Sequence, residues 1–132
     1  MKVITIRQPF AWAVFHGKAV ENRSWATVHR GLLLIHAGRS RASLGARLPR
    51  RLRPRSADLH FGALVGVCQL VDCVPYSEAL ADDLFAAGPW CWLLEDARAF
   101  PDPVPCSGRR GLWDVAVKGP LAVQLRLCGA RV

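Results

Sequence analysis

Short apolar runs separated by polar and glycine-rich turns predict a chain built mainly of strands. "VITI" (3–6) and the glycine-bounded run "RGLLLIHAG" (30–38) have the length and branching of buried strands. "GALVGVCQLVDCV" (62–74) alternates small and branched residues around two glycines, which suits a long, bent strand of a closed barrel. Further strands are expected at 90–94, where Trp90, Trp92 and Leu94 share one face, at 112–115 and at 120–128.

One helix is expected between the first two strands. In "QPFAWAVFHG" (8–17), Phe10, Val14 and Gly17 recur at helical spacing, Pro9 suits the first turn, and Gly17 is placed to end the helix in a left-handed conformation. No internal repeat or change of composition marks a domain boundary. We therefore expect one domain over residues 1–132, of mixed α+β class but mainly β, shaped as a small barrel.

The segment after this helix, "KAVENRSW" (18–25), places charged side chains between apolar runs. On a strand, Glu21 and Arg23 point to the same face, because side chains alternate with a period of two. A binding site is one interpretation. Its cations would neutralise phosphate, Glu21 and Gln8 would hydrogen-bond the edge of an unpaired base, and an aromatic ring would stack on it. The candidate binding residues are Arg7, Gln8, Lys18, Glu21, Arg23 and Trp25, with Trp12 as a second stacking candidate. A glutamate in this role suits the amino group of cytosine or adenine.

Two other interpretations of the same segment stay open. In a hydrolase, Glu21 would activate water as a general base while Lys18 or Arg23 stabilised an oxyanion. His16, His29 or His36 would be a helper if the substrate were RNA. In a purely structural interpretation, Glu21 and Arg23 form a cross-strand ion pair that closes one end of the barrel, Lys18 is a solvated residue after the helix, and Gln8 caps the helix.

Charge is concentrated in one part of the chain. The net charge is +8, and the segment 38–56 carries seven arginines and no acidic residue. These arginines are Arg39, Arg41, Arg47, Arg50, Arg51, Arg53 and Arg55. The segment is either an arm that makes auxiliary phosphate contacts or a solvated loop in an arginine-rich protein.

Several classes of protein are not supported by the sequence. Five cysteines form an odd set without a CxxC pair, and the four histidines show no helical HxxxH, so we assign no disulfide framework, metal or other cofactor. The longest apolar run reaches about eleven residues, short of the roughly 18 that a membrane helix needs. Arg7, Gln8 and Pro9 interrupt the apolar start, so we expect no export signal and a cytoplasmic location.

Taken together, "ITIRQPFAWAV", "GKAVENRSW", "RGLLLIHAG", "GALVGVCQLVDCV" and "GLWDV" resemble the ASCH domain family, and "IRQP" with "NRSW" resembles one bacterial branch of it. The family signature of glycine, lysine, glutamate and arginine matches Gly17, Lys18, Glu21 and Arg23. The resemblance implies a PUA-like β-barrel with short helices at its openings, and an RNA- or nucleotide-binding cleft beside this motif.

The resemblance also implies an alternative. Some small members resemble amidohydrolases that act on N4-acylated cytidine through a lysine, a threonine and a glutamate, and others are ribonucleases. Lys18 matches that lysine, whereas Glu21 stands where the amidohydrolase branch has its threonine. An enzyme of either kind would use Lys18 and Glu21 as its catalytic residues.

Overall fold

A six-stranded sheet forms the framework of the protein. The computed structural model describes residues 1–42 and 48–132, the side chain of Arg51 excepted. The strands follow the order β2-β5-β4-β3-β1-β6 across the sheet. Their bounds are β1 Lys2–Gln8, β2 Val20–Arg23, β3 Gly31–Arg41, β4 Ala63–Pro75, β5 Trp90–Pro105 and β6 Leu112–Asp114. The helices are α1 Phe10–Val14 and α2 Gly119–Leu127, with single 3-10 turns at Arg50–Leu52, Ser56–Asp58 and Glu78–Leu80.

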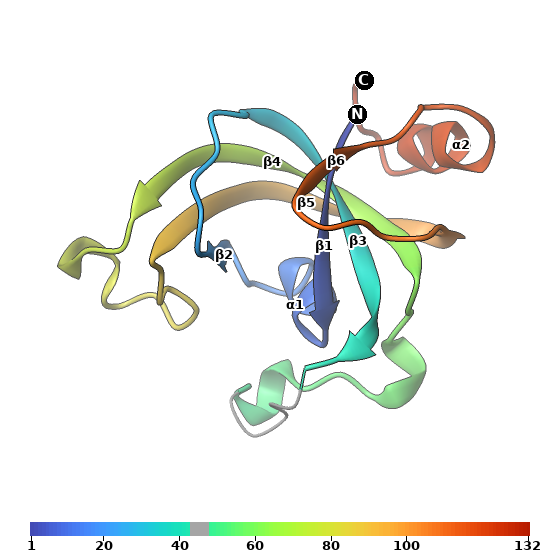
Figure 1. The fold of residues 1–132 in the computed structure, drawn as a ribbon. Coiled ribbons are helices and arrows are strands. Elements are labelled where there is room, and N and C mark those ends of the chain that lie inside the picture. Colours follow the sequence, from blue (N-terminus) through green and yellow to red (C-terminus); the bar gives the residue numbers. More distant parts are fainter. Residues whose placement is uncertain (43–47) are drawn as a thin grey trace.

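The sheet is mainly antiparallel and strongly curved. β1 and β3 are parallel neighbours, and the other pairs are antiparallel. The long strands β4 and β5 arch over the molecule (Figure 1), and their register shifts at three places, one of them next to Gly66. Such irregularities bend a strand and increase its twist. A side-chain carbon at Gly66 would overlap the ring of Phe15 below it, so glycine allows the sheet and α1 to approach closely.

The mainly β fold with an early helix between the first two strands is confirmed, but the barrel does not close. Within the described residues, β2 pairs only with β5 and β6 pairs only with β1, so a seam remains between β2 and the β1 edge. β6 covers that edge only from Lys2 to Ile4, which leaves the later part of β1 facing the seam.

Both faces of the curved sheet are covered. On the side of α1, Ala11 and Val14 pack with Ile4, Ile35 and Trp92. On the side of α2, the helix contributes the apolar residues Leu121 and Leu125 to a second cluster with Val3, Leu34 and Trp113. Central strands buried on both faces read as continuous apolar runs, which is why "LLLI" and "VITI" show little alternation.

The strand expected at 120–128 is wrong, because this segment forms α2. Leu121, Val123, Leu125 and Leu127 alternate as in a strand, yet only Leu121 and Leu125, one helical turn apart, are buried, while Val123 and Leu127 are exposed. Pro120 fits the first turn of the helix, where a missing N–H is not needed. None of the helices in the described part of the chain is both long and apolar enough to cross a lipid bilayer.

Candidate functional site

The signature motif lies along the open seam of the sheet. Arg23, at the end of β2, reaches across and donates from Nη2 to the carbonyl oxygen of Thr5 in β1 at 2.7 Å. A side-chain hydrogen bond therefore connects β2 and β1 at the place where backbone pairing of these strands would close the barrel. The interpretation that Glu21 and Arg23 share a face is confirmed, since the carboxylate Oε2 lies 2.9 Å from Arg23 Nη2.

Glu21 is the centre of a three-membered charge cluster. Lys18 Nζ donates to Glu21 Oε1 at 2.8 Å and to the carbonyl oxygen of Val20 at 2.6 Å. Lys18 is only 4% exposed and Glu21 8% exposed, so the solvated Lys18 of the purely structural interpretation is wrong. Both carboxylate oxygens thus accept from a cation in a partly desolvated environment, where charge-assisted hydrogen bonds are strong. The cluster fixes both cations in place at the seam.

Two adjoining hollows open beside this cluster. The first, which we call the motif pocket, has a volume of about 500 Å³ and is lined by Thr5, Ile6, Arg7, Phe10, Lys18, Glu21, Asn22, Arg23 and Ala42. The second, the arginine cleft, has a volume of about 610 Å³, and its charged residues are Arg7, Arg23, Arg39, Arg109 and Arg110. The two share Thr5, Arg7 and Arg23 as lining residues. Both volumes fall in the range of about 300–1,000 Å³ typical of ligand sites.

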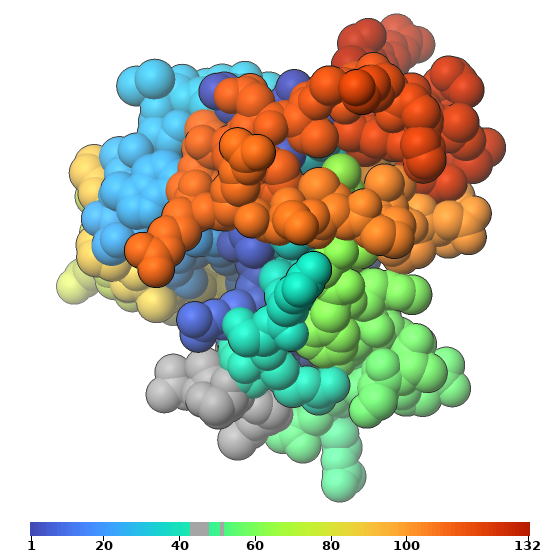
Figure 2. Space-filling view, turned by 45° about the vertical axis from the view of Figure 1, so that its right-hand side comes forward, coloured from blue at the N-terminus to red at the C-terminus, as the bar shows by residue number. Residues whose placement is uncertain are grey.

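The arginine cleft carries positive charge and no acidic residue among its lining side chains. Figure 2 shows a hollow in the surface between the end of β3, the end of β1 and the segment that precedes β6. Arg7, Arg39, Arg109 and Arg110 are exposed, and none of them forms an ion pair within the described residues. A hollow lined by one sign of charge concentrates ligands of the opposite sign.

A buried histidine anchors one wall of the cleft. His36 in β3 donates from Nε2 to the carbonyl oxygen of Cys106 at 2.6 Å, so Nδ1 is left as an acceptor, 3.3 Å from the Thr5 hydroxyl. Trp113 Nε1 donates to the same hydroxyl at 3.2 Å. Burial lowers the pKa of His36 below its usual value and the charge of Arg39 adds to this, while the bond to Cys106 opposes it. A neutral imidazole therefore holds the segment that leads to Arg109.

Three of the aromatic and amide candidates lie away from the motif pocket. Gln8 is buried and donates to the carbonyl oxygen of His60, while its own oxygen accepts from the backbone N–H of Trp12. Trp25 packs edge-on against Trp92, with ring centroids 4.9 Å apart, and its carbonyl oxygen accepts from the Trp92 indole. Trp12 stacks on His16 and lines a different cavity of about 290 Å³. The aromatic ring that does line the motif pocket is Phe10.

The arginine-rich segment does not act as one unit. Arg39 lines the cleft, whereas Arg41 lies over the ring of Phe61, Arg53 bonds the carbonyl oxygen of Leu48, and Arg55 pairs with Asp58. Arg50 is exposed. Arg47 lies outside the described residues, as does the side chain of Arg51.

Arg109 and Arg110 are the cleft residues that sequence reasoning missed. Their segment "SGRRG" is a glycine-flanked turn next to a strand, a pattern that shows exposed cations. What the pattern does not show is that this turn folds back over β1 and β3, more than 60 residues earlier in the chain.

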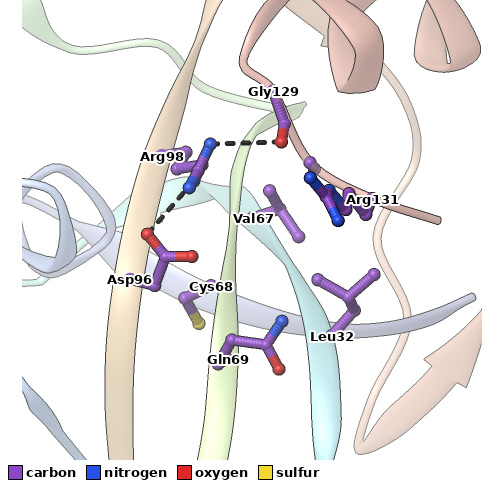
Figure 3. Close-up of a pocket in the computed structure, with 9 residues that line it drawn as sticks. Leu32, Val67, Cys68, Gln69, Asp96, Arg98, Gly129 and Arg131 are labelled. Carbon is purple, nitrogen blue, oxygen red and sulfur yellow. Dashed lines mark hydrogen bonds and ion pairs between the residues drawn. The ribbon is translucent and has the colours of Figure 1, made fainter.

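A further pocket lies between the sheet and the chain that follows α2. It measures about 180 Å³ and is lined by residues of β3, β4 and β5 and of the chain after α2. Figure 3 shows Arg98 reaching from β5 to the carbonyl oxygen of Gly129, with Asp96 on its other side. Arg98 also donates to the carbonyl oxygen of Cys128, so it ties the end of α2 to the sheet.

The carboxylate of Glu21 is the counter-charge of both cations in the cluster. Each of its oxygens accepts one hydrogen bond from a cation and keeps a further lone pair. Within the described residues, no group of three histidine, cysteine, aspartate or glutamate side chains could hold a metal ion.

Comparisons with known proteins agree with this architecture. The chain is similar in fold to a crystal structure of an ASCH protein from Zymomonas mobilis, with a TM-score of 0.54 and 17% identity over 96% of this chain and 93% of that one. A tyrosine-to-phenylalanine variant of that protein gives a TM-score of 0.53 and 16% sequence identity. The match covers 96% of this chain and 95% of the variant. No curated protein sequence matches the chain. The model of the ASCH domain matches residues 4–102, and the chain therefore belongs to the ASCH domain family.

Proposed function

We propose that the protein binds single-stranded RNA, with phosphates along the arginine cleft and a nucleotide base in the motif pocket. The observation that carries this proposal is the cleft itself: five arginines and no acidic side chain line a hollow of about 610 Å³. Membership of a family that is thought to bind RNA supports the same ligand. Arg7, Lys18, Glu21 and Arg23 keep the binding roles expected from the sequence, and Arg39 keeps its expected phosphate contact. Arg109 and Arg110 are added as phosphate contacts.

The proposal has a quantitative consequence. Each phosphate contact with a single strand contributes about −0.7 to the slope of log affinity against log salt concentration. If the four arginines without ion pairs each take one phosphate, the slope is about −2.8. Affinity then falls about 50-fold between 50 and 200 mM salt.

A salt series with a fluorescently labelled single-stranded RNA of mixed sequence tests this consequence. Replacing both Arg109 and Arg110 by alanine should halve the slope to about −1.4, so that the same salt step weakens binding only about sevenfold. The matched control replaces Lys118 and Arg126, two exposed cations at α2, and should leave the slope unchanged. Equal slopes for both double variants would contradict the proposed cleft.

The same samples separate binding from hydrolysis. Intact oligonucleotide recovered after incubation supports a binding protein, as the engaged carboxylate of Glu21 leads us to expect. Turnover of RNA or of N4-acetylcytidine that disappears in Glu21→Gln would favour the hydrolase alternative instead.

A further inference from the structure

The motif pocket offers more hydrogen-bond donors than its own residues use. Lys18 Nζ carries three N–H groups, and two of them reach Val20 and Glu21. Arg23 uses Nη2 for Thr5 and Glu21, while its Nε is buried and has no hydrogen-bond partner within the described residues. A buried donor without an acceptor costs free energy, so the pocket gains from a ligand that brings acceptors.

The side-chain acceptors of the same wall are all engaged. Glu21 accepts from Lys18 on one oxygen and from Arg23 on the other. The Asn22 side-chain oxygen accepts from the backbone N–H groups of Ala87 and Gly88, away from the cations. The remaining acceptor, the Thr5 hydroxyl, already receives the indole N–H of Trp113. A ligand that presents its own N–H groups to this wall must therefore share acceptors that already take a donor.

An apolar surface lies next to these donors. Phe10, at the start of α1, is partly buried against the core and lines the pocket, with Lys18 Nζ 6.0 Å from its ring centroid. Ile6 of β1 lines the same hollow. An aromatic face beside charged donors suits a planar ring with polar edges, since stacking on aromatic side chains is how proteins hold unpaired bases.

We propose that the motif pocket selects a keto base, uracil or guanine, over the amino bases cytosine and adenine. This inference rests on the proposed RNA-binding function and specifies its base. Uracil presents a carbonyl oxygen where cytosine presents an amino group, and guanine differs from adenine in the same way. The carbonyl would accept the third N–H of Lys18, whereas the amino group would have to share acceptors that already hold a donor. This proposal differs from the amino base expected from Glu21 alone, because it also counts the donors of Lys18 and Arg23.

Two oligonucleotides of equal length decide the question. Fluorescence anisotropy with labelled oligouridylate and oligocytidylate of about ten nucleotides compares bases of the same size that differ at the polar edge. One hydrogen bond to a charged donor corresponds to roughly tenfold in affinity, so the uridylate should bind about tenfold more tightly. Equal affinities, or tighter binding of the cytidylate, with a steep salt response would overturn the base preference alone. No salt-dependent binding of either strand would overturn the proposed function as well.

The variant Lys18→Met tests whether the N–H groups of Lys18 cause the preference for uridylate. The variant keeps the chain length and apolar stem of Lys18 and removes its N–H groups, so the preference for uridylate should fall below about twofold while the salt slope keeps most of its value. Arg39→Ala is the matched control: it removes a cation from the cleft only, and should weaken both strands by the same factor. A Lys18→Met protein that retains the full preference would refute the assignment. If that variant does not fold, the wild-type comparison still decides whether the preference exists.

Discussion

Removing the carboxylate of Glu21 should destabilise the protein far more than removing a surface carboxylate. In Glu21→Ala, Lys18 keeps only the carbonyl oxygen of Val20 and Arg23 keeps only that of Thr5, so two poorly solvated cations lose their counter-charge. Deleting one partner of a buried ion pair costs about 3–5 kcal/mol. Because each cation retains one acceptor, we expect the lower end, about 3 kcal/mol.

Urea denaturation followed by circular dichroism measures this loss. With a slope of about 2 kcal/mol per molar urea, the midpoint should fall by about 1.5 M. Asp114→Asn, which breaks the exposed pair with Lys2, is the control and should leave the midpoint unchanged. Adding Lys18→Met to Glu21→Ala should recover part of the loss, because one unpaired buried cation is then gone. A midpoint for Glu21→Ala equal to that of the control would refute the idea that the cluster is effectively desolvated.

Three further outcomes follow from buried groups. The depressed pKa of His36 means that the unfolded chain takes up a proton more readily than the native one. The contribution of His36 to the free energy of unfolding should therefore be fully present above about pH 6.5 and decline as the pH falls below that value. Between about pH 7.5 and about pH 5.5, the urea midpoint of the wild-type protein should fall more than that of His36→Gln. Gly66→Ala should cost about 1–3 kcal/mol in the same assay, since the added carbon overlaps the Phe15 ring and lies 2.6 Å from the backbone oxygen of Arg98; a neutral effect would show that the sheet and α1 can move apart. Burial raises the pKa of the Cys68 thiol to about 12, so iodoacetamide at mildly alkaline pH should leave Cys68 unmodified in the native protein and label it in urea, as peptide mass spectrometry would report.

Features that depend on a local period were predictable from the sequence. The alternation in "VENR" places Glu21 and Arg23 on one face, and the structure joins them in an ion pair. The long apolar runs correspond to β3 and β4, and the small residues of β4 accompany its curvature.

Features that depend on which segments meet were not predictable in the same way. The apolar residues of 120–128 fit both the period of a strand and that of a helix. The packing of Leu121 and Leu125 against the sheet favours the helix. Trp25 follows a polar run and Phe10 begins the helix, yet Trp25 packs against Trp92 while Phe10 lines the motif pocket. Contacts of this kind come from tertiary structure, which one sequence does not display.

The last three residues of β2 make two separate sets of contacts, one on each side of the strand. Glu21 and Arg23 build the site at the seam, while the Asn22 amide between them clamps the turn before β5, bonding the backbone of Phe85, Ala87 and Gly88. Shifting the strand by one residue would turn the charged side chains toward the turn before β5 and the Asn22 amide toward the seam. The motif consequently depends on the alternation of side chains along β2 as much as on residue type. A single substitution weakens one of the two sets of contacts, whereas inserting or deleting one residue here disrupts both.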